Sequence, residues 1–155
     1  MLTVGIHLWQ LILLWMVMLV PSSPWRATYE ETAIAIAETV QENAPLYADD
    51  ETRIKTAATL VALARFESAF NPTAVGDNGA SHGLYQQQRD GELHDVREAT
   101  RVALSQIRIS GRICRGRNRG ELLGWYAAGG DGCSNPRGLQ QSRNRMNLAF
   151  KLVGE

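Results

Sequence analysis

The amino-acid sequence predicts a single domain that is mainly α-helical. Apolar residues recur with a helical period over residues 30–43, 54–66 and 95–109, which is the pattern of helices that pack one face against a core. No stretch alternates apolar and polar residues well enough to predict a strand. A chain of 155 residues, of which 45% are hydrophobic, is long enough for one compact core and too short for two comfortable ones.

The first two helices follow directly from this pattern. One covers residues 30–43 and ends before Pro45, which cannot continue a helix. The next covers residues 54–66, and Asp49 or Asp50 is in place to cap it. Because this run is almost wholly apolar, its helix is expected at the centre of the fold.

A loop and three further helices complete the predicted order. Residues 76–83 are too rich in Gly and turn formers for regular structure, so we expect a loop that is either functional or disordered. The third helix should begin at Asp90 or Asp95. A short helix is expected over residues 121–128 and, after a Gly-rich break, a last helix over residues 142–153.

Charge is distributed unevenly along a chain whose formal net charge is zero. Residues 1–100 hold six Lys and Arg against thirteen Asp and Glu, whereas residues 101–155 hold ten against three. Either the basic half favours an anionic polymer, such as nucleic acid or bacterial wall material, or the halves neutralise each other across the fold. Basic and aromatic residues are not interleaved as in single-strand binders, so we do not expect nucleic acid as a partner.

The first 25 residues are predicted to be a hydrophobic targeting helix, separate from a domain at residues 26–155. Residues 2–20 contain no Lys, Arg, Asp or Glu, and Pro-Ser-Ser-Pro follows them. The apolar core at residues 11–20 has the length of a signal-peptide h-region, yet the whole stretch approaches the length that spans a bilayer. Cleaved signal peptide and retained membrane anchor both stay open, and a buried core helix is less favoured because no polar second face is present. In either targeting case the domain is exported.

The two cysteines, Cys114 and Cys133, fit an exported domain. A single pair in such a domain is more often a disulfide than two free thiols. Closing a loop of this size contributes about 3 kcal/mol in the chain-entropy model. Two Cys and three scattered His offer no ligand spacing, so neither a metal nor another cofactor is expected.

Glu67 is the candidate catalytic residue, because it continues the most apolar stripe of the second helix. Helical spacing places Leu60, Leu63 and Ala64 on the same face. A carboxylate there loses hydration, which favours the protonated form unless a cation pairs with it, and a protonated carboxyl can act as a general acid. The alternative is an ordinary residue at a helix end that points to water.

A resemblance to a known family adds to this interpretation. The motifs that carry it are Glu-Ser at 67–68, Asn-Pro at 71–72, Ala-Val at 74–75, Gly-Ala at 79–80, Gly-Leu-Tyr-Gln at 83–86 and Gly-Trp-Tyr-Ala-Ala-Gly at 124–129. With these, residues 50–153 resemble the soluble lytic transglycosylase (SLT) family, which has a goose-type, lysozyme-like fold. The Gly-Asp-Asn-Gly loop is similar to that of phage-borne and conjugation-system members.

The resemblance implies a peptidoglycan lytic transglycosylase. Such an enzyme cleaves the β-1,4 bond between N-acetylmuramic acid and N-acetylglucosamine in glycan strands. Glu67 would protonate the glycosidic oxygen and then, as a carboxylate, deprotonate the 6-hydroxyl of the muramic acid, which closes to a 1,6-anhydro product. Because this nucleophile is intramolecular, the second carboxylate of a hydrolytic glycosidase is not required.

The resemblance also implies substrate contacts. Ser68 would position the loop or a sugar near Glu67, or else close the helix end by a local hydrogen bond. Gln86 would hydrogen-bond the sugar, while Gly83 is better explained by backbone geometry than by a contact. Tyr126 would direct its hydroxyl at the carboxyl or the substrate, or else be a core aromatic.

The chain departs from the family pattern at two positions. Tyr85 replaces the usual Met at a position that faces the sugar, and Ala127 replaces an Asn and so removes a hydrogen-bonding side chain. Asp77 is the nearest acid downstream of Glu67 and is first a turn former. It could activate water if the protein were a hydrolase.

Two rival functions therefore accompany the transglycosylase hypothesis. One is a hydrolytic muramidase, or lysozyme, that acts on the same bond. The other is a non-catalytic, membrane-anchored factor that binds glycan or helps an assembly. All three place the protein in the bacterial cell envelope, with peptidoglycan as its partner and the N-terminal segment as its contact with the membrane. A phage, a secretion or conjugation apparatus and ordinary wall turnover all stay open as its context.

Overall fold

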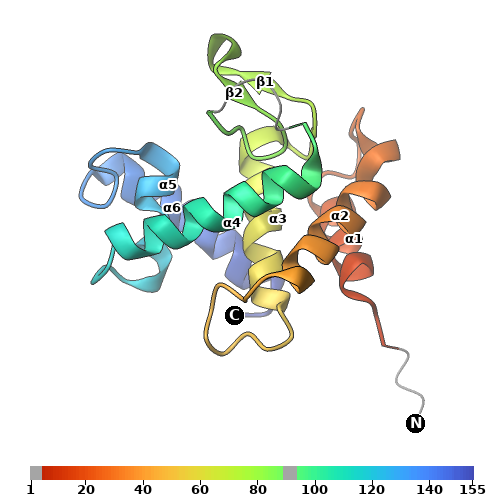
Figure 1. Cartoon of the computed structure of the whole chain (residues 1–155), viewed down its shortest axis with the longest axis horizontal. Coiled ribbons are helices and arrows are strands. Elements are labelled where there is room, and N and C mark those ends of the chain that lie inside the picture. Colours follow the sequence, from red (N-terminus) through yellow and green to blue (C-terminus); the bar gives the residue numbers. More distant parts are fainter. Residues whose placement is uncertain (1–4, 89–93) are drawn as a thin grey trace.

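A computed structural model describes residues 5–88 and 94–155 and confirms the mainly α-helical fold (Figure 1). The helices are α1 (Leu8–Leu19), α2 (Tyr29–Glu42), α3 (Ile54–Ser68), α4 (Val96–Ile113), α5 (Gly124–Ala128) and α6 (Pro136–Leu152). A small sheet pairs β1 (Val75–Gly76) with β2 (Ser81–His82). The short 3₁₀ helices are η1 (Arg26–Thr28), η2 (Asp77–Gly79) and η3 (Arg119–Glu121).

Helix α3 lies at the centre of the molecule, as its apolar sequence predicts (Figure 1). Residues 56–64 are all buried, and the helix packs against α1, α2, α4 and α6. Asp50 caps it from outside, because its carboxylate accepts hydrogen bonds from the main-chain N–H groups of Lys55 at 3.1 Å and Thr56 at 2.8 Å. Glu67 therefore lies in the last turn of a helix that the core holds on every side.

Helix α1 packs on the rest of the fold. Ile12, Trp15 and Met16 are buried, and the helix contacts α2 and α3. The Tyr29 hydroxyl donates a hydrogen bond of 2.9 Å to the carbonyl of Val20, which holds the end of α1 beside the start of α2. Within the described residues, no helix combines the length and the apolar character needed to cross a membrane. This packing agrees with the less favoured alternative, a buried core helix. That the segment is a signal peptide or a membrane anchor stays a prediction.

The capping residues of the later helices show where the sequence marks a helix start. Helix α4 begins after Asp95, whose side chain caps it as expected. Helix α6 begins at Pro136 rather than at residue 142, because Asn135 caps it and a proline suits the first helical position. The helix expected over residues 121–128 is divided between the end of η3 and α5.

The C-terminal half is closed by the disulfide between Cys114 and Cys133, which confirms the predicted pairing. It joins the end of α4 to the loop between α5 and α6. Three glycines allow close packing there: a Cβ on Gly124 would lie 2.4 Å from the carbonyl oxygen of Gly132, and a Cβ on Gly138 would lie 2.5 Å from the same oxygen. Larger residues at these positions would force α5 and α6 apart.

The segment between α3 and α4 corrects the prediction of an irregular loop. It forms an antiparallel hairpin in which Val75 pairs with His82 and Gly76 with Ser81. Asp77 and Asn78, with φ of 50° and 56°, adopt the left-handed conformation that the tight turn between the strands requires. Strands of two residues are too short to show alternation in the sequence, so no strand was predictable here.

Candidate active site

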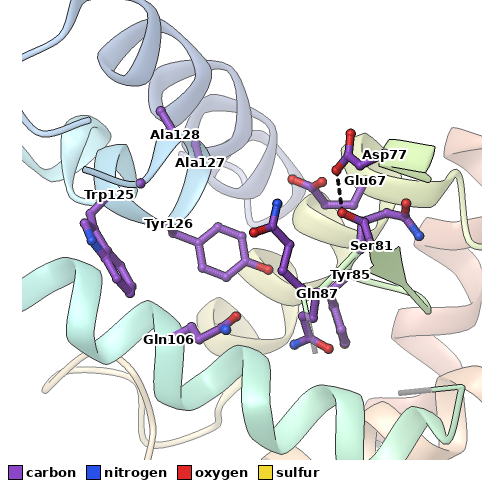
Figure 2. Close-up of a pocket in the computed structure, with 13 residues that line it drawn as sticks. Glu67, Asp77, Ser81, Tyr85, Gln87, Gln106, Trp125, Tyr126, Ala127 and Ala128 are labelled. Carbon is purple, nitrogen blue, oxygen red and sulfur yellow. Dashed lines mark hydrogen bonds between the residues drawn. The ribbon is translucent and has the colours of Figure 1, made fainter. Parts of the chain in front are cut away.

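A groove of about 360 Å³ lies between the end of α3, the hairpin segment, α4 and α5. We call it the Glu67 groove (Figure 2). Glu67 lines it together with Gln106 of α4 and with side chains from residues 77–88 and 125–129. Segments far apart in the sequence thus meet around one carboxyl group. Most of these side chains are polar or aromatic, which suits a ligand with many hydroxyl groups.

Glu67 continues a buried stripe, as the helical spacing predicts. Leu60, Leu63 and Ala64 are fully buried, whereas the Glu67 side chain keeps 21% of its exposure and faces the groove. The apolar stripe fixes the helix, and the groove gives the carboxyl access to solvent and ligand. The position combines the two alternatives that the sequence offered, a buried face and a helix end.

Arg145 of α6 is the cation that pairs with Glu67. Its Nη2 and Nε atoms donate to the same carboxylate oxygen, Oε1, at 2.9 Å and 3.3 Å. Arg145 is itself held, because Nη1 donates to the carbonyl of Gln141 at 3.1 Å and the guanidinium lies 5.1 Å from the ring centroid of Phe66. Within the described part of the chain, Oε2 accepts no hydrogen bond, so this oxygen is the one available to a ligand.

Tyr126 of α5 brings a buried hydroxyl to the groove. Its oxygen has no hydrogen-bond partner among the described residues, and Figure 2 shows the ring reaching into the groove from the α5 side. Burial raises the pKa of Tyr126, and the negative charge of Glu67 raises it further. The hydroxyl thus stays protonated at neutral pH. A buried polar group without a partner is costly, so it points to a ligand that completes it.

Ser68 connects α3 to the hairpin segment. Its hydroxyl oxygen lies 2.7 Å from the carbonyl oxygen of Leu84 and 3.3 Å from that of Ala64. Both alternatives for this residue, the loop contact and the local helix-end contact, are therefore present. Gly83 has a φ of 77°, and its N–H donates to the carbonyl of Ala74 at 2.8 Å. Its position is explained by backbone geometry, and neither Ser68 nor Gly83 is among the described residues that line the groove.

Gln86 and Gln87 differ in the hydrogen bonds that their side chains make. The Gln86 amide nitrogen donates to the carbonyls of Ala74 and Gly83, each at 3.1 Å, so it mainly fixes the segment although it lines the groove. Gln87 is 3% exposed. Its nitrogen donates to the carbonyl of Ala99 at 2.9 Å, whereas its Oε1 has no partner in the part of the chain that the structure describes. Gln87 is therefore a better candidate than Gln86 for a ligand contact.

Tyr85 contributes its ring to the groove but not its hydroxyl. The residue is 1% exposed, and its hydroxyl is hydrogen-bonded to the Thr100 hydroxyl at 3.0 Å. Burial raises the pKa of Tyr85. This tyrosine and Tyr126 thus differ in one respect, since only Tyr126 has a hydroxyl that a ligand could satisfy.

Asp77 also lines the groove, at the hairpin turn. Its carboxylate accepts a hydrogen bond from the Ser81 hydroxyl, and both side chains lie on the same side of the groove as Glu67 in Figure 2. Asp77 forms part of the left-handed turn, as its sequence context predicts. Because it also lines the groove, it is a second carboxylate within the site.

Several groove residues were not predicted from the sequence. Trp125 and Gln106 line the groove, and Arg145 and Gln87 make the contacts described above. Trp125 stands beside Tyr126 in the motif, so an aromatic neighbour was an available signal. Arg145 lies 78 residues from Glu67, and no local pattern joins the two.

The donor set of the groove consists of carboxylates, amides and phenols. Within residues 5–88 and 94–155, no group of three or more His, Cys, Asp or Glu is placed to hold a metal ion. The arrangement can supply a carboxyl group that exchanges a proton, an oriented cation behind it, and several uncharged hydrogen-bonding groups for a polar ligand.

Comparison with known proteins gives no match. No family model, no curated protein and no solved structure resembles the chain at a significant level. The site must therefore be interpreted from its own chemistry.

Proposed function

We propose that the protein is a peptidoglycan lytic transglycosylase with a lysozyme-like domain. It cleaves the β-1,4 bond between N-acetylmuramic acid and N-acetylglucosamine and leaves 1,6-anhydro ends. The observation that carries this proposal is Glu67 at the end of the buried helix α3, with one carboxylate oxygen fixed by Arg145 and the other available in a polar groove. The motif resemblance around Glu67 supports it.

In the proposed reaction, Glu67 acts twice. Its protonated carboxyl donates to the glycosidic oxygen, so the bond to the leaving sugar breaks. The resulting carboxylate then accepts the proton of the 6-hydroxyl on the muramic acid, whose oxygen bonds to the anomeric carbon. Intramolecular attack of this kind reaches effective molarities of about 10⁵ M or more when well oriented. One carboxyl group is therefore sufficient.

Arg145 favours the second of these steps. A guanidinium that donates twice to Oε1 stabilises the carboxylate and orients Oε2 toward the groove. The first step needs the neutral carboxyl instead. Glu67 must therefore take up a proton from solvent at Oε2 before it can donate to the glycosidic oxygen. Arg145 is thus the group that positions the Glu67 carboxyl for both steps.

The remaining groove residues suit a chain of sugars. Trp125 supplies an aromatic surface on which a sugar ring can lie, while the free oxygens of Gln87 and Tyr126 can hydrogen-bond its hydroxyl and acetamido groups. An uncharged ligand with hydroxyl and amide groups fits these contacts. We further propose an envelope location, with residues 1–25 as signal or anchor, which the disulfide between Cys114 and Cys133 favours weakly.

A hydrolytic muramidase is the second candidate, and Asp77 is the observation that favours it. It places another carboxylate on the same groove, and a hydrolase needs such a group to activate water or to bind the sugar covalently. The hydrogen bond from Ser81 already occupies Asp77. The intramolecular route explains the site with fewer requirements.

Product analysis distinguishes these functions. Purified protein is incubated with peptidoglycan, the soluble muropeptides are separated, and their masses are measured by mass spectrometry. A transglycosylase releases 1,6-anhydro products, which are lighter by one water than the hydrolytic products of a muramidase. Products with reducing ends alone would exclude the transglycosylase, and binding without any release would indicate a non-catalytic glycan-binding factor.

A further inference from the structure

A second cavity adjoins the Glu67 groove. We call it the Arg137 pocket; it has a volume of about 340 Å³. Ala127 and Ala128 line both cavities, and Figure 2 shows them at the α5 end of the groove. Both residues that the two cavities share carry only a methyl group. A branch of a ligand bound in the groove would thus meet small side chains at this wall.

The Arg137 pocket differs in chemistry from the groove. Its remaining lining residues are Asp131, Asn135, Arg137 and Gln141. Asp131 and Arg137 are exposed, and neither takes part in an ion pair with a described residue. The pocket thus presents one negative and one positive group, with no aromatic surface among its lining residues.

Gln141 supplies a further unsatisfied group. Its Oε1 is buried and has no hydrogen-bond partner within residues 5–88 and 94–155, so it can accept from an N–H donor. The main-chain carbonyl of the same residue accepts from Arg145, which pairs with Glu67. Arg145 therefore contacts both Gln141, which lines the pocket, and Glu67, which lines the groove.

These features match a peptide better than a sugar. An amide N–H suits the buried oxygen of Gln141, a carboxylate suits the guanidinium of Arg137, and an ammonium suits Asp131. Neutral sugars carry neither charge and are usually bound against aromatic surfaces, which this pocket lacks. The muramic acid of peptidoglycan carries a short peptide branch with all three groups.

We propose that the Arg137 pocket binds the peptide branch of the glycan while the sugar backbone occupies the Glu67 groove. This inference rests on the proposed function, since it names a second part of the same substrate. It makes the protein selective for peptide-bearing strands. Arg137, Asp131 and Gln141 are then specificity residues that take no part in bond cleavage.

The first test compares two substrates. Intact peptidoglycan and glycan strands stripped of peptide by an amidase are digested by the wild-type protein, by Arg137→Ala and by Lys151→Ala. Lys151 is an exposed cation on the same helix that lines neither cavity, so it is the matched control. We expect Arg137→Ala to lower kcat/KM on intact peptidoglycan about tenfold, as for loss of a charge-assisted hydrogen bond, and to leave the stripped strands unaffected. Equal loss on both substrates, or loss on neither, would overturn the proposal.

The second test does not depend on cleavage. The free stem tetrapeptide L-Ala-γ-D-Glu-meso-diaminopimelate-D-Ala is titrated into the full chain carrying Glu67→Gln, and amide shifts are followed by NMR. Shifts centred on residues 127–141 that Arg137→Ala or Gln141→Leu abolishes support the pocket. If the peptide produces no such shifts, the proposal is wrong, whether or not the protein cleaves glycan. If the peptide binds but the wild-type protein never cleaves glycan, the proposal for the Arg137 pocket stands and the proposal of a transglycosylase is wrong.

Discussion

Helix α3 and the hairpin segment that faces it are held by different forces. Residues 56–64 of α3 are buried among apolar side chains on every side. The segment from Val75 to Gln87 adds Leu84 and Tyr85 to the core, but it is otherwise held by strand pairing and a few hydrogen bonds, such as those from Ser68 to Leu84 and from Gln86 to Ala74. Packing along a whole helix thus fixes Glu67, whereas two core side chains and individual hydrogen bonds fix the opposite wall. Substitutions on the two sides should therefore change stability and activity in different proportions.

The largest effect on activity is expected where chemistry is removed with the least change to either region. Glu67→Gln keeps the size of the side chain and its place in α3 but cannot exchange a proton. We expect at least a 10²- to 10⁴-fold loss of activity, as is typical for a general acid or base, with an unchanged circular dichroism spectrum. The measurement is the release of muropeptides from peptidoglycan.

Asp77→Asn is the matched control for this variant. Asn can still accept the hydrogen bond from Ser81, so the hairpin turn should be retained. If Glu67 acts alone, this variant keeps most of its activity. A loss as large as that of Glu67→Gln would instead favour the two-carboxylate muramidase.

The contrast between the two regions is tested most directly by one variant on each side. Leu63 is fully buried in α3, so Leu63→Ala should lower the free energy of unfolding by about 3 kcal/mol. Ser68→Ala removes the contact with the Leu84 carbonyl and should cost only about 1 kcal/mol. Chemical denaturation measures both values. Activity should show the reverse order at a temperature where both variants are folded, because Ser68 fixes the groove wall.

If Ser68→Ala remained fully active, the hairpin segment would not depend on this hydrogen bond. The strand pairing and the Gln86 contacts would then be the main support of the hairpin segment. Ser105→Ala serves as a control, because Ser105 is exposed on α4 and lines neither cavity.

The sequence predicted the helical region well for a physical reason. The apolar run at residues 54–66 predicts a buried helix, and residues 56–64 are buried at every position. Asp95 stands directly before α4 and caps it. The hairpin depends on left-handed residues and on strands of two residues, which leave little periodic signal. The start of α6 was missed because the cap Asn135 and Pro136 lie before the apolar pattern begins, although both are recognised start signals.

The candidate site was predictable to the extent that it is local. Glu67, Tyr126 and the Gly83 to Gln86 segment were found by spacing and resemblance, and the structure brings Glu67, Tyr126 and Gln86 to one groove. Arg145 was not found, since its contact with Glu67 joins helices 78 residues apart in the chain. Pairings of this kind arise from tertiary packing alone, so sequence spacing could not reveal the cation that a buried carboxylate needs.

Arg145 offers an intermediate effect, because it belongs to neither region. Arg145→Met keeps an apolar stem and leaves the Glu67 carboxylate without its cation. We expect a loss of about 2 kcal/mol in unfolding free energy, less than for a fully buried pair, since the Glu67 side chain is 21% exposed. Adding Glu67→Gln completes a double-mutant cycle, and the coupling energy isolates the ion pair.

Activity distinguishes a positioning role for Arg145 from a structural one. If Arg145 orients the carboxylate, Arg145→Met lowers kcat more than it raises KM, and Arg145→Lys restores part of kcat because it returns one charged donor. A purely structural role predicts instead that Met and Lys variants of equal stability have equal kcat. A coupling energy near zero would show that the pair contributes nothing to the folded state.

The smallest effects concern the two tyrosines, and their signs are opposite. Tyr126→Phe removes a buried hydroxyl that has no partner among the residues described, so stability should be unchanged or higher by up to about 1 kcal/mol. Tyr85→Phe breaks the hydrogen bond to Thr100 and should destabilise by about 1 kcal/mol. For activity the order reverses: Tyr126→Phe should lower kcat/KM several-fold while Tyr85→Phe leaves it nearly unchanged, because only the Tyr126 hydroxyl is free for substrate. Thermal unfolding and muropeptide release measure the two properties on the same samples, and a destabilised, fully active Tyr126→Phe would mean that its hydroxyl belongs to the scaffold.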